Sequence, residues 1–304
     1  MRVSAARPEL IRMLNERLVL DHIRTNGPSS RAELARASGL SKSTVSMAMA
    51  NVERAGLVRE AGHRRGAPGR AAQLYEVTPD AGFVLALDVG RQFLRGALAN
   101  LTGSIVARET VRSRAIQGRR RVSELIGLAD ILTARAGISR AALTQTVVGC
   151  PGVYDRHADT IRLTGGLTGW DQPGIPAWLR DAFGESLMVE NDVDAAALAE
   201  QAHGHGRHAG SFAFVTVGTG IGMGLVLESR TSADTVFDVD GVAGVIKNAG
   251  VLLLLMDERR EPFGKSFLRR AFKPRLGLLV FVEQPMFCAK LATCLAPAGV
   301  AFEK

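Results

Sequence analysis

The sequence predicts an α/β chain in which a small winged helix-turn-helix unit precedes a larger α/β domain. Apolar residues in the first 80 positions recur at helical spacing, and a short basic hairpin follows them. From residue 81 onward, apolar strands alternate with helices. The chain has 304 residues, 46% of them hydrophobic and 22% charged, which is enough for about two globular domains.

The first unit opens with a helix predicted over residues 9–26. Gly27 and Pro28 end it, because proline cannot continue a helix. A second helix follows, with Ser30 before it and Glu33 in its first turn. The helix is predicted from apolar residues at helical spacing, which are Leu10, Leu14, Leu18 and Ile23, with Val19 and Leu20 between them.

Residues 31–50 are the centre of this unit and are predicted to form two short helices joined by a tight turn. Gly39 lies where the chain turns, since a residue without Cβ enters positive φ at no steric cost. Ser41 is suited to cap the second of the two helices. The buried face of that helix is predicted from Val45, Met49 and Val52, which recur at i, i+4 and i+7.

The opposite face of this second helix carries small polar and basic side chains. Such side chains donate to phosphates and base edges, so the helix suits the major groove of double-stranded DNA. The alternative is an ordinary helical hairpin with a solvated face, but the turn glycine and inner apolar positions favour a helix-turn-helix. The candidate DNA-binding residues of the helix are Ser41, Lys42, Ser43, Thr44, Ser46 and Asn51.

A basic β-hairpin follows the helix-turn-helix. Residues 54–59 are predicted to pass from a helix end into a strand, and residues 72–77 alternate as a return strand. Between them lies a glycine-rich tip, so the three parts together make a winged helix. The wing is expected to contact phosphates or a minor groove through Arg64, Arg65 and Arg70, and a merely solvated loop is the alternative.

Charge and composition favour a polyanionic partner and a cytoplasmic location. The net charge is +8, and residues 1–80 hold 13 Lys and Arg against 8 Asp and Glu. The longest apolar runs are too short to span a bilayer, and the N-terminus lacks the apolar segment of a signal peptide. The cysteines, Cys150, Cys288 and Cys294, are too scattered for a disulfide framework or a metal knuckle, so no metal is expected.

Two domains are predicted, at residues 1–80 and 81–304. The second is divided into a first part, residues 81–185, and a second part, residues 186–304. Residues 83–111 are predicted as an antiparallel meander. The further elements are a helix over 122–136, a strand over 146–152, a loop over 166–171, a helix over 176–183, a strand over 186–190, a helix over 193–203 and a strand pair over 212–227.

Glycine-rich turns suggest two loops that face a phosphate. One contains Asp88 and Gly90, and the other spans residues 218–222. Glycines let backbone amides approach an anion closely, although each loop alone is a weak signal. Asn191 and Asp192 stand at a strand end that opens a helix, which suits a general base and also suits a simple N-cap.

The order of these motifs resembles the ROK family of repressors and sugar kinases. The resemblance covers about residues 10–228 and implies an actin-like, two-lobed sugar-kinase fold behind the winged helix. It implies that Asp192 is the catalytic base of a kinase and that Asn191 contacts a sugar hydroxyl. It also assigns Asp88 and Gly90 to the first phosphate loop, and to the second Gly218, Thr219 and Gly220.

The sequence departs from the family pattern at the ATP, sugar and zinc sites. Arg91 and Gln92 replace a Gly-Thr pair in the first loop, so ATP binding is not expected. Val245 replaces a sugar-binding carboxylate, Asn248 replaces a histidine, and the family's zinc cysteines are absent, so no cofactor is expected. Residues 229–304 match poorly, and the second lobe is expected to be diverged, truncated or frame-shifted.

These features predict a sequence-specific DNA-binding transcriptional regulator, a sugar-responsive repressor of the ROK type. Its partners would be a palindromic DNA operator, bound as a homodimer, and a sugar or sugar-phosphate effector at Asn191 and Asp192. No membrane is expected among them. One alternative is a sugar kinase that acts on a hexose or an N-acetylhexosamine. The other is a DNA-binding regulator that has lost effector control.

Overall fold

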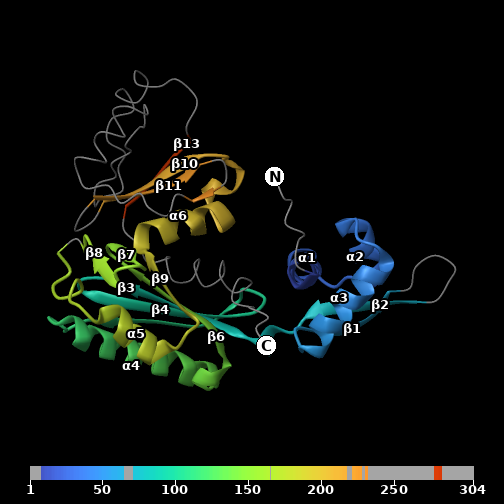
Figure 1. The fold of residues 1–304 in the computed structure, drawn as a ribbon, viewed down its shortest axis with the longest axis horizontal. Coiled ribbons are helices and arrows are strands. Elements are labelled where there is room, and N and C mark those ends of the chain that lie inside the picture. Colours follow the sequence, from blue (N-terminus) through green and yellow to red (C-terminus); the bar gives the residue numbers. More distant parts are fainter. Residues whose placement is uncertain are drawn as a thin grey trace. The chain divides into compact units, whose positions relative to one another are not determined.

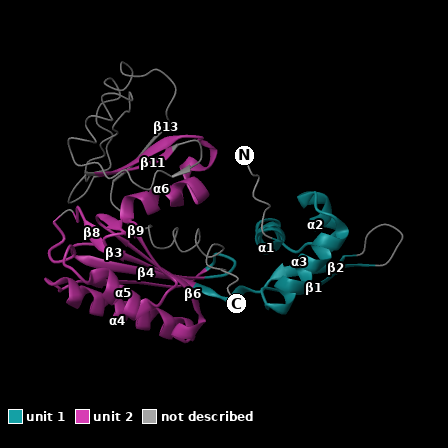
Figure 2. Ribbon diagram, viewed as in Figure 1, with its two compact units in different colours: residues 1–83, 100–104, 296–304 teal, residues 84–99, 105–295 magenta. Residues whose placement is uncertain are grey.

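The computed structural model describes residues 8–64, 71–164, 166–217, 221–227, 230–231 and 277–282. The chain divides into two compact units, and each is a fold of its own (Figure 2). Unit 1 contains residues 1–83 and 100–104, with 296–304 assigned to it, and unit 2 contains residues 84–99 and 105–295. None of the described helices is both long and apolar enough to cross a membrane.

Unit 1 is the predicted winged helix (Figure 1). Its two strands pair antiparallel, with a bulge between Glu60 and Gly62. Ser29 adds an isolated bridge to Tyr75, so the connection between the first two helices extends the small sheet. The elements in order are α1 (Pro8–Asn26), α2 (Arg31–Ser38), α3 (Lys42–Arg54), β1 (Val58–Arg64), β2 (Ala72–Val77) and the 3-10 helix η1 (Pro79–Ala81).

The core of unit 1 uses one face of α1. Of the apolar residues that predict this helix, Val19, Leu20 and Ile23 are buried, whereas Leu10, Leu14 and Leu18 have exposed fractions of 50%, 55% and 43%. Both sets of residues satisfy helical spacing, because α1 carries apolar residues on two faces. The core takes the other face, and its members include Val19, Leu20, Ile23, Leu34, Val45, Met49, Val52 and Tyr75.

The first sheet of unit 2 has the strand order β5-β4-β3-β6-β9. The pair β4–β5 is antiparallel and the pair β6–β9 is parallel. Figure 1 shows α4 and α5 beneath this sheet. Its elements are β3 (Phe83–Val89), β4 (Phe93–Asn100), β5 (Ile105–Arg112), α4 (Gly118–Ala136), the 3-10 helix η2 (Arg140–Ala142), β6 (Leu143–Cys150), α5 (Ile175–Phe183) and β9 (Leu187–Asn191).

The sequence prediction missed a small hairpin in this part of the chain. The strands β7 (Val153–Asp155) and β8 (Thr160–Arg162) pair antiparallel. Three residues are too few to show an alternating pattern. Arg180 of α5 donates two hydrogen bonds to Asp159 at the turn, at 2.6 and 2.8 Å, which fastens the hairpin to the helix.

The second sheet repeats the strand order of the first. Its order is β12-β11-β10-β13. If the described strands of each sheet are counted along the chain, both sheets place the third beside the second, the second beside the first and the first beside the fourth. This repetition is the actin-like arrangement that the sequence predicts. The elements are α6 (Asp192–His203), the 3-10 helix η3 (His205–His208), β10 (Phe212–Val217), β11 (Ile221–Leu227), β12 (Arg230–Thr231) and β13 (Gly277–Val282).

Helix α6 lies between the two sheets of unit 2 (Figure 1). One core cluster joins alanines of α6 to both sheets, and it includes Ala86, Val147, Ala195, Ala196, Ala197, Phe212 and Phe214. The alanines Ala195, Ala196, Ala197 and Ala199 are all buried, and their small side chains fit a helix that packs between two sheets. On β11, a Cβ at Gly224 would lie 2.8 Å from the Val193 carbonyl oxygen, so glycine permits the close approach of this strand.

Candidate DNA-binding surface and effector site

The N-terminus of α3 is built as the sequence predicts. The Ser41 hydroxyl accepts a hydrogen bond from the Thr44 backbone N–H at 3.1 Å and caps the helix. Gly39 has a φ of 68° at the end of α2, the left-handed conformation that the turn requires. Lys42, Ser43 and Ser46 are exposed, which leaves a polar and basic face open to a partner.

Thr44 and Met47 change the composition of that face. Thr44 is half-buried, and its hydroxyl lies 2.8 Å from the Ser41 hydroxyl, so it belongs partly to the cap. Met47 has an exposed fraction of 62% and was not predicted as a site residue. Its position four residues after Ser43 places it on the same side of the helix. A methionine there offers an apolar contact for a thymine methyl group.

Asn51 has a different place from the one predicted for it. Its Nδ2 donates to Glu16 Oε1 of α1 at 2.5 Å, and its Oδ1 accepts from Arg54 at 3.1 Å. Glu16 is buried, so this contact lies in the α1–α3 interface. The side chain of Asn51 therefore links α3 to α1. This corrects its prediction as a residue of the exposed face of α3.

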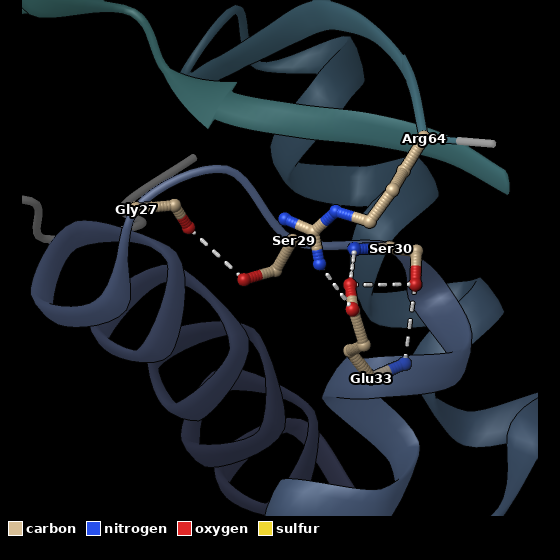
Figure 3. Close-up of polar contacts among 5 residues, drawn as sticks. All are labelled: Gly27, Ser29, Ser30, Glu33 and Arg64. Carbon is tan, nitrogen blue, oxygen red and sulfur yellow. Dashed lines mark hydrogen bonds and ion pairs between the residues drawn. The ribbon is translucent and has the colours of Figure 1, made fainter. Parts of the chain in front are cut away.

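The wing residues fall into two groups. Arg64 is the last residue of β1, and its guanidinium donates to Glu33 Oε1 of α2 at 2.6 Å. Figure 3 shows this contact beside the cap of α2. Arg65 and Arg70 lie outside the described residues, so their predicted contacts with phosphates stay predictions.

The predicted effector site lies where strands of the first sheet of unit 2 end. Asp88 stands near the end of β3, and Cys150 pairs with Asn191 at the ends of the parallel strands β6 and β9. Asp192 follows directly as the first residue of α6. The topology thus brings Asp88, Asn191 and Asp192 to one edge of the sheet, as ligand sites in α/β sheets require.

The two aspartates at this edge are both affected by burial. Burial raises the pKa of Asp88 to about 6, against the opposing effect of the Arg95 guanidinium 3.1 Å away. Burial also raises the pKa of Asp192 to about 7, and the negative charge of Asp88 adds to this shift. The pKa of Asp192 therefore lies near neutral pH, whereas the Asp88 carboxylate forms an ion pair with Arg95.

We expect Asp192→Asn to stabilise the folded chain at pH 8. A raised pKa means that the folded state binds the proton more tightly, so the free energy of unfolding falls as pH rises from 3.8 through about 7. Asparagine avoids this loss and should add about 1–2 kcal/mol at pH 8, less than the full shift implies because Asp192 is half-buried.

Urea unfolding at pH 5 and pH 8 measures this difference. The exposed Asp171 supplies the control, since Asp171→Asn removes a charge of the same sign from a position that solvent reaches. A gain for Asp192→Asn that is equal at the two pH values would contradict the assignment of the shift to burial.

Asn191 uses its side chain to shape the site. Its Oδ1 accepts from the backbone N–H groups of Val193 and Asp194 at 2.9 and 3.1 Å, which caps α6. Its Nδ2 donates to the Gly152 carbonyl oxygen at 2.9 Å. An amide nitrogen has two protons, so one donor remains for a ligand. The two predictions for Asn191, a cap and a sugar contact, are therefore compatible.

The first glycine turn is fixed by an arginine that the sequence prediction did not single out. Arg121 is buried and donates to the Gly90 carbonyl oxygen at 2.9 Å. A Cβ at Gly90 would lie 2.7 Å from the Phe93 carbonyl oxygen, so the hairpin itself requires glycine there. Arg91, which replaces a glycine of the family pattern, donates to the Gly166 carbonyl oxygen at 3.3 Å.

The remaining predicted positions lie outside the described residues. These are Gly218, Thr219 and Gly220 of the second loop, and also Val245, Asn248, Cys288 and Cys294. Within the described part of the chain, no group of three or more His, Cys, Asp or Glu side chains could hold a metal ion. Cys150 is buried there, and burial raises the pKa of its thiol to about 12.

Comparison with protein families agrees with this division of the chain. The ROK family model matches residues 84–246, which begins where unit 2 begins and covers more than half of the chain. The chain belongs to the ROK family. In this ROK protein, residues 14–66 also match the MarR family, and the match covers the helix-turn-helix of unit 1.

Several known proteins are similar to this ROK protein. It is 25% identical to the xylose repressor of Bacillus spizizenii over 194 residues, which are 64% of this chain and 50% of that repressor. It is 27% identical to a putative xylose repressor of Caldicellulosiruptor sp. over 197 residues, 64% of this chain and 49% of that protein. The chain thus spans about half the length of the curated relatives it matches.

A solved structure supports the fold. The crystal structure of a ROK family transcriptional regulator, a homolog of the E. coli MLC protein, superimposes with a TM-score of 0.61. The alignment is 21% identical and covers 75% of this chain and 58% of that one. At this identity the likeness shows the fold alone, a winged helix-turn-helix with an actin-like α/β domain.

Proposed function

We propose that this ROK protein is a sequence-specific DNA-binding regulator that represses transcription in response to a sugar. The observation that carries the proposal is the capped helix α3, whose face with Lys42, Ser43 and Ser46 is exposed. Helices of this kind enter the major groove with their N-terminal residues against the bases. The MarR match over residues 14–66 supports the same reading.

The effector that we propose is a pentose such as xylose, bound at the sheet edge of unit 2. Relatives that match this chain are named xylose repressors, and the edge offers Asn191 and the half-buried Asp192 as hydrogen-bonding groups. Two copies of the chain would bind a palindromic operator in the cytoplasm, since a C2 dimer matches a two-fold symmetric site.

The sugar response is tested on a DNA complex. The full chain is bound to a duplex that it has selected from a random library, and D-xylose is titrated in, with D-glucose as a comparison. The proposal predicts that D-xylose weakens DNA binding and that Asp192→Asn reduces this effect. A DNA affinity that no sugar changes would leave a regulator without effector control, because a ligand shifts an equilibrium only by its differential affinity.

We expect Lys42→Ala to weaken binding to all duplexes alike. Lys42 is exposed at the start of α3, where a lysine reaches the phosphate backbone. Loss of one phosphate contact should lower the slope of log K against log salt by about 0.9. Fluorescence anisotropy at several salt concentrations measures the slope. Arg120→Ala, an equal charge change on α4, should leave the slope unchanged.

A sugar kinase is the second candidate, and the raised pKa of Asp192 favours it. A carboxylate whose pKa lies near 7 is suited to take a proton from a sugar hydroxyl. The ion pair between Asp88 and Arg95 opposes this candidate, because it occupies a carboxylate of the first phosphate loop. A coupled assay of ADP release across a sugar panel, with Asp192→Asn as control, separates the two candidates.

A further inference from the structure

Two segments far apart in the sequence meet at the base of the wing. Glu33 lies in the first turn of α2, and Arg64 is the last residue of β1, directly before the wing tip. The Arg64 guanidinium donates to Glu33 Oε1 at 2.6 Å. The two side chains have exposed fractions of 30% and 56%, so the pair is accessible to solvent.

The two oxygens of Glu33 have separate partners. Oε2 accepts from the Ser30 backbone N–H at 2.8 Å and from the Ser30 hydroxyl at 2.9 Å, while Oε1 accepts from Arg64 (Figure 3). These contacts to Ser30 complete a capping box. The hydrogen bond from the Ser30 backbone is the main cause of the lowered pKa of Glu33, so the carboxylate is charged at neutral pH.

The helical side of this contact is itself fixed to the wing sheet. Ser29 exchanges two backbone hydrogen bonds with Tyr75 of β2, each 3.0 Å long. Arg31 stacks over the Tyr75 ring at 5.1 Å. The start of α2 therefore holds β2 through Ser29 and Arg31, and it holds the end of β1 through Glu33.

We propose that Glu33 is a positioning residue for the hairpin of β1 and β2, because it holds the end of β1 against α2 through Arg64 and so keeps the hairpin in one position when the chain binds DNA. This inference rests on the proposed DNA-binding function. A rigid wing loses less conformational freedom on binding, which favours the complex. If only charge mattered, removal of the Glu33 carboxylate would strengthen DNA binding, because a negative charge on a DNA-binding surface repels the phosphates. A positioning role predicts weaker binding instead.

The variant Glu33→Gln separates the two duties of the residue. Glutamine also serves at this position of a capping box, so α2 keeps its cap, but its amide cannot form the ion pair with Arg64. We expect binding to the selected duplex to weaken about two- to five-fold, the range that an exposed ion pair can supply. Asp130→Asn is the matched control, since it breaks the Asp130–Arg140 pair of unit 2 with the same change in net charge.

A second arm uses no DNA. Trypsin cleaves after arginine, and Arg65 and Arg70 lie in the sequence between β1 and β2, so the rate of cleavage there reports how firmly the hairpin is held. Glu33→Gln, which breaks the pair and leaves every arginine of this segment in place, should be cleaved faster there than the wild type and the Asp130→Asn control. In the DNA assay, Arg70→Ala should also cost less affinity in the Glu33→Gln background than in the wild type.

The two arms separate failure of the positioning role from failure of the proposed DNA-binding function. Tighter DNA binding by Glu33→Gln, or cleavage rates equal to those of the wild type, would overturn the positioning role. A random library from which the wild type selects no duplex would instead reject the proposed function, and the trypsin arm would still decide whether Glu33 holds the hairpin.

Discussion

Ser43→Ala combined with Ser46→Ala is expected to remove most of the sequence preference of the chain and to leave its general affinity for DNA. Both serines are exposed on α3, whose core contacts are made by the buried residues Val45 and Met49. Each lost contact to a base edge costs about 1–3 kcal/mol of discrimination, so the pair should cost about 2–6 kcal/mol. Lys42 is retained, and it supplies a contact that does not depend on sequence.

The measurement is the ratio of dissociation constants for the selected duplex and a scrambled duplex of equal composition. Ser123→Ala on α4 is the control, because it removes an equal hydroxyl from unit 2. A double variant that keeps the wild-type ratio would move recognition away from this face of α3. In that case the exposed Met47 and the wing would be the next candidates.

Gly224→Ala is expected to destabilise unit 2 by about 1–3 kcal/mol, the range for added volume in a packed core. A Cβ at this position would lie 2.8 Å from the Val193 carbonyl oxygen and 2.9 Å from the Ala197 Cβ. The first of these contacts is to the backbone of α6, which cannot rotate away, so β11 must shift. Val193 follows Asp192 in α6, so strain at this contact lies next to the candidate effector site.

Urea unfolding provides the comparison for this variant. At Gly210, which is exposed, a Cβ would meet no atom within 4 Å, so Gly210→Ala is the matched control. A free energy of unfolding equal to that of the wild type would show that the approach of β11 to α6 is looser than described.

Local signals allowed much of unit 1 to be predicted from the sequence. The capping serines Ser30 and Ser41 and the turn glycine Gly39 act within a few residues of their own positions, and the structure confirms all three. Local signals did not predict the contact of Asn51 with Glu16 or the ion pair of Arg64 with Glu33. Their partners Glu16 and Glu33 lie 35 and 31 residues away, and no spacing rule relates them.

The contacts of the candidate effector site also depend on residues that local patterns do not relate. The motifs with Asp88 and Asp192 were found from local patterns, but the pairing of Asp88 with Arg95 depends on the hairpin register. Arg121 was missed because an arginine within a helix is usually solvated, whereas here it is buried and bound to the Gly90 and Ala115 carbonyl oxygens. The repeated strand order of the two sheets leaves no sequence repeat, since topology alone is shared.

Whether this ROK protein recognises a DNA sequence is tested most directly by one ratio of dissociation constants. The full chain selects duplexes from a random library, and its dissociation constants for the selected and the scrambled duplex are measured at physiological salt. We expect a ratio of about 10³ or more, as for specific protein–DNA complexes. A ratio near one would contradict this expectation and would leave the basic face of unit 1 as a general polyanion-binding surface.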